Sequence, residues 1–131
     1  MFGGTFNPPH SGHVAAACAC VSQLGLDKLL LVPTAVPPHK QLPTLTATSA
    51  QRLEMAELAA SLIPNAEASD IELARGGASY TKITLDALRE KYPQDELWLI
   101  MGTDMLESFH NWREPEGICS LARLADRKSV V

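Results

Sequence analysis

Two histidines near the start of the chain have the residue type and spacing most suited to chemistry. His10 and His13 lie three positions apart within the segment Gly3–His13. On a helix, side chains three positions apart lie on one face. The first turn of a helix offers unpaired N–H groups and the positive end of the helix dipole to an anion. The spacing therefore predicts a phosphate site with two imidazoles beside it.

Glycines around these histidines support this interpretation. Gly3 and Gly4 let the backbone pass close to a ligand, and Gly12 leaves room for a phosphate to approach the helix. The pair could instead cap a helix, lie at the surface or form half of a metal site. No cysteine, aspartate or third histidine stands nearby at a ligand-like spacing, so we predict no metal held by the protein.

Lys40, with His39 before it, follows the apolar run 28–34 within a proline-rich loop over 35–47. A solvated lysine is the simpler explanation of this residue alone. Its place after a predicted strand, beside the anion site, favours a phosphate contact.

Gly102 and Asp104 follow a second apolar run, 96–101. The aspartate either begins a helix as its N-cap or accepts hydrogen bonds from a ribose hydroxyl or a base amine. Trp112 lies among polar residues and suits stacking on a flat ring. Tyr80 and Thr81 either cap a helix or offer hydroxyl and N–H groups to a carboxylate.

Helices and strands alternate along the chain, which predicts an α/β fold: an open parallel sheet with helices on both faces. The apolar spacing predicts helices over 11–24, 49–63, 80–92 and 116–121, and strands over 28–34, 67–73, 96–101 and 122–125. Only two residues precede Gly3, so little of a first strand is expected. In such sheets ligands bind at the carboxyl ends of the strands, where the candidate segments would meet.

Composition narrows the class of protein. The 131 residues suit a single domain over 1–131. The net charge of −4, without a block of basic residues, argues against nucleic acid or an anionic membrane as a partner. We see no signal peptide, and the three cysteines lack a paired spacing, so we expect a reduced, cytoplasmic protein.

The motif in Gly3–His13 resembles the signature of the H-x-G-H nucleotidyltransferases. Three further segments narrow the resemblance to the bacterial nicotinate-nucleotide adenylyltransferases; they are Val36–Lys40, Ser79–Thr81, and Met101–Asp104 followed by Phe109–Trp112. Together they span most of the chain in the expected order. The resemblance implies a Rossmann-like sheet and transfer of the adenylyl group of ATP to nicotinate mononucleotide, a late step in NAD biosynthesis.

It also implies a role for each matching residue. His10, His13 and Lys40 would bind the ATP phosphates. The substrate would be bound by Gly4, Thr5, Phe6, Tyr80, Thr81, Gly102, Asp104 and Trp112, with Thr81 near the nicotinate carboxylate and Trp112 stacked on the pyridine ring. Mg²⁺ would arrive with the ATP phosphates. ATP and nicotinate mononucleotide would be the partners, and a homo-oligomer is an open alternative.

Two departures from that family shape the expectation. A complete first strand and a late Ser/Thr-rich motif ending in arginine are missing, so the sequence looks truncated at both ends and the sheet incomplete. The alternatives are a catalytically impaired nucleotide-binding remnant, or another H-x-G-H enzyme such as a phosphopantetheine adenylyltransferase. The preference between nicotinate and nicotinamide stays open.

Overall fold

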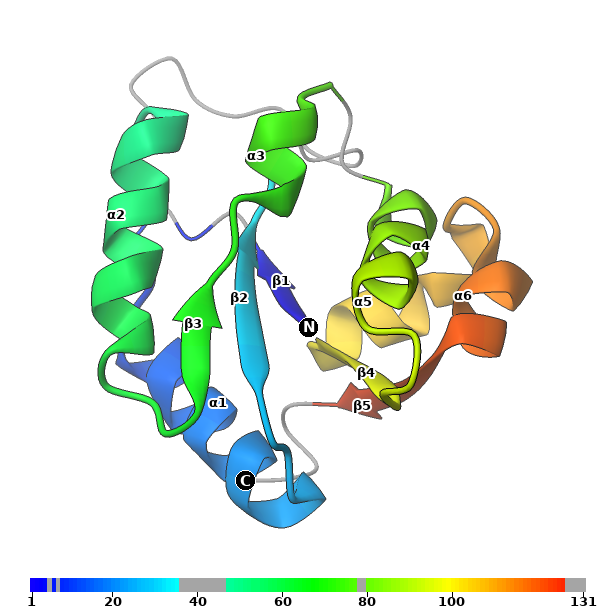
Figure 1. Cartoon of the computed structure of the whole chain (residues 1–131), viewed down its shortest axis with the longest axis horizontal. Helices are drawn as coiled ribbons and strands as arrows, with labels where there is room; N and C mark the ends of the chain where they lie inside the picture. Colours follow the sequence, from blue (N-terminus) through cyan, green and yellow to red (C-terminus); the bar gives the residue numbers. More distant parts are fainter. Residues whose placement is uncertain (5, 7, 36–46, 78–79, 127–131) are drawn as a thin grey trace.

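A computed structural model of the chain describes residues 1–4, 6, 8–35, 47–77 and 80–126. Its centre is a parallel five-stranded sheet with the order β3-β2-β1-β4-β5 (Figure 1). The strands are β1 (Phe2–Gly4), β2 (Leu29–Pro33), β3 (Ala66–Ala68), β4 (Leu97–Met101) and β5 (Ala122–Asp126). The predicted α/β class with an open parallel sheet is confirmed.

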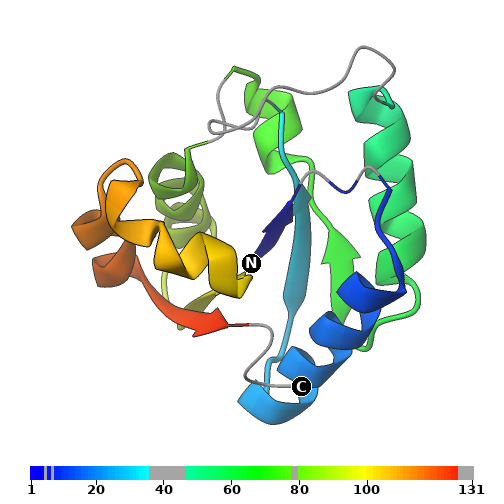
Figure 2. The ribbon, with the colours of Figure 1, turned by 180° about the vertical axis from the view of Figure 1, so that it is seen from behind.

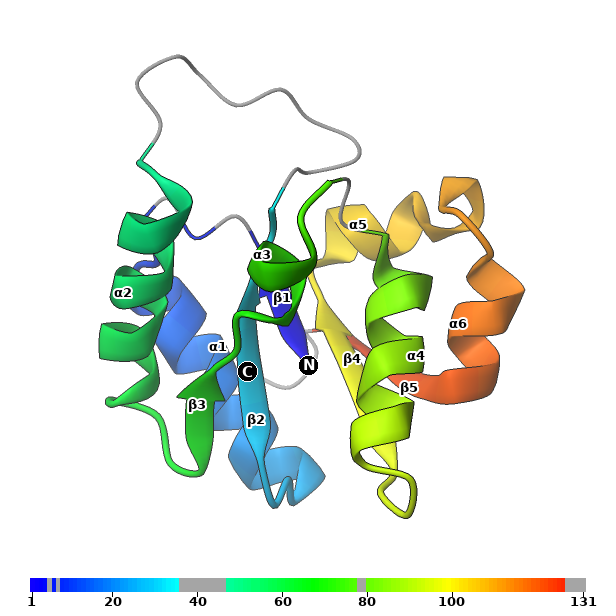
Figure 3. The same ribbon diagram turned by 45° about the horizontal axis from the view of Figure 1, so that its top comes forward.

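Helices connect the strands and cover both faces of the sheet. They are α1 (Ser11–Leu24), α2 (Ser49–Ala60), α3 (Ile71–Arg75), α4 (Thr81–Lys91), α5 (Thr103–Glu107) and α6 (Pro115–Leu121), and the 3₁₀ turn η1 (Phe109–Asn111) lies between α5 and α6. Helices α1 and α2 lie on one side of the sheet, and α4 and α6 lie on the other (Figure 3). None of the helices in the described ranges is long and apolar enough to cross a membrane.

Alternate residues of the central strands divide the core into two clusters. Leu29 and Leu31 of β2 pack with the small buried residues of α1 and α2, which lie side by side in Figure 2. Leu30 and Val32 point to the opposite face and pack against α4 and α6. Successive side chains on a strand point to opposite faces, and a parallel sheet buried on both faces therefore reads as a continuous apolar run.

One predicted strand, 67–73, is wrong beyond its first two residues. The edge strand β3 ends at Ala68, and Ile71–Arg75 forms the short helix α3. The Ser69 hydroxyl accepts a hydrogen bond from the Ile71 N–H, and the Ala74 N–H donates to the Asp70 carbonyl oxygen. These local bonds start a helical turn where the loose apolar alternation of the sequence suggested a strand.

The first strand is more complete than two preceding residues suggested. β1 pairs with β2 from Phe2 to Gly4 and meets β4 at Phe2. The Ile100 N–H donates to the Met1 carbonyl oxygen over 2.9 Å. Three residues therefore suffice for a central strand, because both neighbours supply hydrogen bonds.

Candidate functional site

Three strand ends meet at the carboxyl edge of the sheet. Gly4, the last residue of β1, is in register with Pro33, the last residue of β2, and its carbonyl oxygen accepts the Thr34 N–H over 3.0 Å. On the other side of β1, strand β4 ends at Met101. The segments that follow these strands thus start at one edge, as the sequence predicted.

The two histidines of the Gly3–His13 motif stack at the start of α1. Their ring centroids are 3.8 Å apart with an interplanar angle of 24°. His10 is the N-cap residue of the helix. Its Nδ1 accepts the Gly12 N–H over 3.1 Å, and the Nδ1 of His13 accepts the His10 N–H over 3.0 Å. Each imidazole therefore satisfies one backbone donor that the first turn leaves unpaired.

These bonds determine which nitrogen of each ring carries the proton. An Nδ1 that accepts an N–H bond carries no proton, so the neutral rings of His10 and His13 hold theirs on Nε2. The pair thus presents two Nε2–H donors at the positive end of a 14-residue helix.

Phe6 supports the pair from the core side. Its ring is 3% exposed and lies edge-on to His13 at a centroid distance of 5.2 Å and to Phe2 at 5.9 Å. The backbone of Phe6 has a φ of 48°, in the left-handed region that non-glycine residues seldom adopt. The ring therefore packs behind His13 and is covered from solvent. A ligand would contact the backbone of Phe6 and not its side chain.

Contacts within the chain explain why residue 12 is a glycine. A Cβ built there would lie 2.9 Å from both Cε1 and Nδ1 of His10, a distance at which one of the two groups must move. The sequence suggested that Gly12 admits a phosphate. The structure gives a nearer cause: the small residue lets the His10 ring fold over the helix start.

Gly102 lies at the junction between β4 and α5. It is buried, and its carbonyl oxygen accepts the Leu106 N–H over 3.0 Å, which begins the helix. Asp104 belongs to the first turn of α5, and its side chain is outside the described part of the structure. The backbone thus places both predicted residues at the end of a central strand.

Tyr80 and Thr81 begin α4. Tyr80 is the N-cap residue, and its carbonyl oxygen accepts the Ile83 N–H over 3.2 Å. The guanidinium carbon of Arg113 lies 4.6 Å from the centroid of the Tyr80 ring, a cation–π distance. The start of α4 is therefore held against the segment that follows η1.

Trp112 follows the 3₁₀ turn η1, and its N–H donates to the Phe109 carbonyl oxygen over 3.0 Å. The two rings are tilted at 54° with centroids 5.3 Å apart. Both are half-buried and pack at the edge of the cluster that joins the sheet to α4 and α6. Part of Trp112 is thus core, and part is exposed.

Thr5 and Lys40, two predicted site residues, lie outside the described residues, so their placement stays a prediction. Arg52 of α2 was missed by the sequence analysis. It is 2% exposed and donates from Nη1 to the Thr34 carbonyl oxygen over 2.7 Å, and burial lowers its pKa. A signal was available, because Arg52 stands four positions before Ala56, on the buried stripe of the helix.

The sequence analysis also missed a polar contact between α3 and α4. The Thr84 hydroxyl donates to Oε2 of Glu72 over 3.2 Å, and both residues are buried. A carboxyl residue flanked by Ile71 and Leu73 was the available signal.

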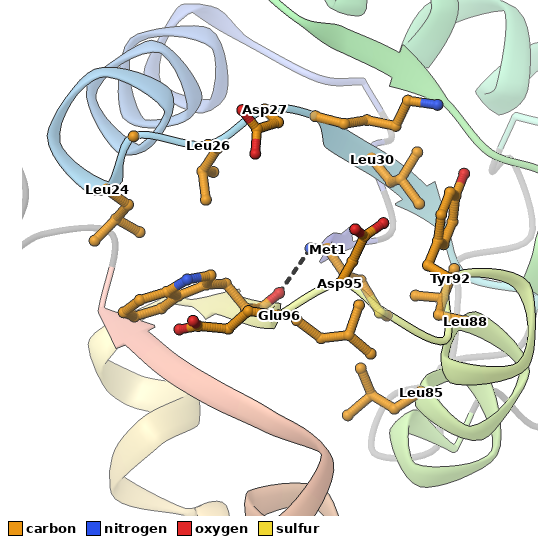
Figure 4. A pocket seen from close by; sticks show the side chains of 14 residues that line it. Met1, Leu24, Leu26, Asp27, Leu30, Leu85, Leu88, Tyr92, Asp95 and Glu96 are labelled. Carbon is orange, nitrogen blue, oxygen red and sulfur yellow. Dashed lines mark hydrogen bonds between the residues drawn. The ribbon is translucent and has the colours of Figure 1, made fainter.

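A hollow lies at the opposite, amino edge of the sheet. A cavity of about 340 Å³ opens between β2 and β4, lined by the leucines 24, 26, 30, 85, 88 and 97 together with Met1 (Figure 4). The Met1 ammonium donates to the Trp98 carbonyl oxygen over 2.7 Å. Burial lowers the pKa of this amine from 8.0 to about 5. None of the predicted site residues lines this cavity, so its volume does not mark the candidate site.

No group of three or more histidine, cysteine, aspartate or glutamate residues that could hold a metal ion occurs in the described ranges. The donors inferred at the carboxyl edge, the Nε2–H groups of His10 and His13, suit anions. This donor set fits a Mg²⁺ ion bound by phosphate oxygens and water rather than by a protein cage.

Comparisons with known proteins agree with this arrangement. The chain is 43% identical over 124 residues to a nicotinate-nucleotide adenylyltransferase of Shewanella baltica, covering 95% of this chain and 56% of the relative. It is 40% identical over 121 residues to the nicotinate-nucleotide adenylyltransferase of Bacillus subtilis, covering 92% of this chain and 64% of the relative. The chain thus spans a little over half the length of these relatives.

Solved structures share the fold. A nicotinate-nucleotide adenylyltransferase structure from Vibrio parahaemolyticus matches with a TM-score of 0.73 at 24% identity, covering 95% of this chain and 73% of that one. A nicotinic acid mononucleotide adenylyltransferase of Plasmodium falciparum, solved in complex with NaAD, matches with a TM-score of 0.72 at 20% identity, covering 88% and 56%.

A family model described as cytidylyltransferase-like matches residues 1–129. The resemblance found in the sequence motifs is thereby confirmed at the level of the family, and the parallel sheet agrees with the fold of the matching structures. The chain belongs to the cytidylyltransferase-like family.

Proposed function

We propose that the protein transfers the adenylyl group of ATP to nicotinate mononucleotide, giving nicotinate adenine dinucleotide and pyrophosphate in NAD biosynthesis. The observation that carries the proposal is the stacked pair of His10 and His13, which presents Nε2–H donors at the start of α1. The names of the bacterial relatives support the choice of substrates.

The reaction needs no nucleophile from the protein. An oxygen of the 5′-phosphate of the mononucleotide attacks the α-phosphorus of ATP and forms the new P–O bond. The bond from the α-phosphorus to the oxygen that bridges it to the β-phosphorus breaks, and pyrophosphate leaves with that electron pair. Such a step depends on in-line placement of the two phosphates and on stabilisation of the charge that develops on their oxygens.

His10 and His13 supply that stabilisation. Their Nε2–H groups donate to phosphate oxygens of ATP, and the positive end of α1 adds its partial charge. Because Nδ1 of each ring is held by a backbone N–H, the donors are oriented before ATP arrives. Preorganised donors are effective because the site does not have to reorganise as charge develops. Lys40 adds a positive charge to the same phosphates.

A Mg²⁺ ion carried by the triphosphate neutralises part of its charge when bound. The residues described above hold phosphate oxygens and would leave the ion's other positions to water.

The mononucleotide occupies the side of the site between α4 and η1. Thr81, at the start of α4, offers its hydroxyl and N–H to the nicotinate carboxylate, and Tyr80 lies beside it. Trp112 stacks its ring on the pyridine. Gly4, Thr5, Phe6, Gly102 and Asp104 line the nucleotide between the two halves. A carboxylate-binding role for Thr81 favours nicotinate over nicotinamide.

Pyrophosphate release from ATP with nicotinate mononucleotide tests the proposal. We expect turnover by the wild type and a decrease in kcat of about 10²–10³-fold in His13→Ala, as for the loss of one preorganised donor. Glu57→Ala is the control, because Glu57 is an exposed residue in the second half of α2 and its loss leaves the rate unchanged. Nicotinamide mononucleotide and phosphopantetheine are assayed in parallel.

Each result decides between the alternatives. Turnover with phosphopantetheine alone would assign a different adenylyl acceptor. A folded wild type that binds nicotinate mononucleotide in calorimetry without turnover would be the impaired nucleotide-binding protein. A folded wild type that binds neither substrate would contradict the proposal altogether.

A further inference from the structure

A buried polar cluster lies directly behind the first turn of α4. The Thr84 hydroxyl is fully buried and donates to Oε2 of Glu72 over 3.2 Å, and Glu72 is 2% exposed. Nη1 of Arg75 donates to the same hydroxyl over 3.1 Å. The hydroxyl of one helix therefore joins both polar side chains of its neighbour α3.

This cluster spans the two ends of one connection. Glu72 and Arg75 lie in α3, and Thr84 lies in the first turn of α4, so the segment between them, 76–80, starts and ends at the cluster. The connection leaves α3 through two glycines with φ of 71° and 68°. Glycine restricts the backbone least. The path of the connection therefore depends strongly on the contacts that hold its two ends, those of Glu72 and Arg75 with Thr84.

Tyr80 contacts Thr84 directly through its backbone. Its carbonyl oxygen lies 3.4 Å from the Thr84 hydroxyl and accepts the Thr84 N–H over 3.3 Å. The side chain of Tyr80 makes no capping hydrogen bond to α4. The orientation of Tyr80 and of Thr81, which follows it, thus depends on the residue one turn further along the helix.

The burial of Glu72 and Thr84 determines how much free energy their contact involves. Burying a carboxyl group and a hydroxyl is unfavourable unless each finds a partner, and a polar contact in a low-dielectric interior resists rearrangement. A valine at position 84 has nearly the shape of threonine and no hydroxyl that must find a partner. The contact is therefore better explained by the geometry that it fixes than by stability alone.

We propose that Thr84 and Glu72 are positioning residues, which hold the start of α4 so that Tyr80 and Thr81 meet the nicotinate half of the mononucleotide. This inference rests on the proposed function, and it adds two residues that touch no substrate. It assigns their effect to one substrate, because the phosphate-binding pair His10 and His13 stands on a different element, α1.

Calorimetry with nicotinate mononucleotide and with ATP, each titrated separately, tests this assignment. Thr84→Val keeps the shape of the side chain and removes the hydroxyl. We expect the Kd for nicotinate mononucleotide to rise roughly tenfold, within the range seen for residues that act through a neighbour. The Kd for ATP should change less than twofold, and Thr84→Ser, which restores the hydroxyl, should return the affinity for the mononucleotide.

A second variant keeps the test valid if Thr84→Val does not fold. Arg75 is exposed, so Arg75→Met removes one donor to Thr84 without opening the core. We expect a rise of about threefold in the Kd for nicotinate mononucleotide, and no further rise when Arg75→Met is added to Thr84→Val. Asp86→Asn is the matched control: this exposed residue of α4 pairs with Lys82 and should leave both affinities unchanged.

The outcomes separate this inference from the function on which it rests. Equal weakening of both ligands would mark Thr84 as merely structural and would overturn the inference, as would unchanged affinity for the mononucleotide in Thr84→Val and Arg75→Met. A folded wild type that binds no nicotinate mononucleotide would instead overturn the proposed function, and with it the inference.

Discussion

The two edges of the sheet differ in what they offer a ligand. At the carboxyl edge, the imidazoles of His10 and His13 stack at 3.8 Å at the start of α1. At the amino edge, a cavity of about 340 Å³ is lined by leucines together with acidic side chains (Figure 4). The carboxylates of Asp27, Asp95 and Glu96 line this cavity and would repel an anion, and none of the predicted site residues lines it. A binding site for phosphates is therefore identified by its polar groups and not by its volume.

The direction of the parallel strands explains this difference. Strands β1, β3 and β4 are followed directly by the helices α1, α3 and α5, and helix N-termini offer N–H groups to anions. The amino edge receives the C-terminal ends of the helices, whose carbonyl groups repel anions. The same crossover connections thus make one edge suited to phosphates and leave the other to packing.

The difference between the two edges predicts that stability and ligand binding can be changed separately. The largest effect is expected for Leu85→Ala, on the free energy of unfolding. Leu85 is fully buried in α4 and lines the cavity at the amino edge. We expect the free energy of unfolding in urea to fall by about 2–5 kcal/mol, with the Kd values for both substrates unchanged in the folded protein. Leu58→Ala is the control, because that leucine is 70% exposed. A tenfold loss of substrate affinity in Leu85→Ala would show that the edges are coupled.

A pH titration of stability should give the next largest effect. In the unfolded chain the Met1 amine binds a proton below pH 8, whereas in the folded chain its pKa is lowered to about 5. The unfolded state therefore holds more protons between these values, and stability falls as the pH decreases from 8 to 5. Three pKa units correspond to a loss on the order of 4 kcal/mol.

Other groups titrate in the same range, so the comparison needs a matched protein. Two apolar residues placed before Met1 would turn its amine into an amide, which can still donate to the Trp98 carbonyl oxygen. We expect this variant to be more stable in urea, with a margin over the parent that grows from pH 8 to pH 5. Parallel stability curves for the two proteins would contradict the role given to the amine.

Gly12→Ala should reduce the rate without reducing stability. A Cβ there would lie 2.9 Å from the His10 ring, so the ring must shift and its Nε2–H donor moves with it. We expect kcat/KM for pyrophosphate release to fall by about tenfold, as for a misplaced catalytic group. Alanine also favours the helix over glycine by about 1 kcal/mol. Ser11→Ala, at the exposed neighbouring position, is the control. Full activity in Gly12→Ala would show that the placement of His10 is not critical.

The smallest effect is expected at Arg113. Its guanidinium lies 4.6 Å from the Tyr80 ring centroid, and an exposed cation–π pair contributes about 0.5–1 kcal/mol. We expect Arg113→Gln to weaken nicotinate mononucleotide about two- to fivefold in calorimetry, while Arg113→Lys retains most of the affinity. Equal loss in both variants would assign the effect to packing of the arginine stem instead of its charge.

The sequence predicted the elements that carry a strong local pattern. The helix over 11–24 and the strands at 28–34 and 96–101 appear within one residue of their expected bounds. The His10 and His13 spacing predicted a shared helical face, and the structure stacks the two rings. These features depend on neighbours in the chain, which a sequence displays directly.

The features that depend on distant partners were not predicted. The strand expected over 67–73 ends at Ala68, because the side chain and backbone bonds around Asp70 start a helix. Arg52 and Glu72 look like surface charges until their partners, the Thr34 carbonyl and the Thr84 hydroxyl, are brought to them by the fold. The roles of the individual site residues, including Lys40, stay predictions.

In a chain whose first residue is Met1, the rate at which its buried amine is chemically labelled reports how often strand β1 opens. Reagents that acylate amines need direct access, and Met1 is bonded to Trp98 in the line of the central strand. Acylation would therefore be faster while β1 is lifted from its neighbours, whereas a reagent reaches the exposed Lys28 without any opening of the sheet. The ratio of the two labelling rates would count how often the middle of the sheet opens under native conditions. Strand β1 leads into the segment that carries His10 and His13. The opening frequency of β1 is therefore also the frequency with which this part of the candidate site loses its support.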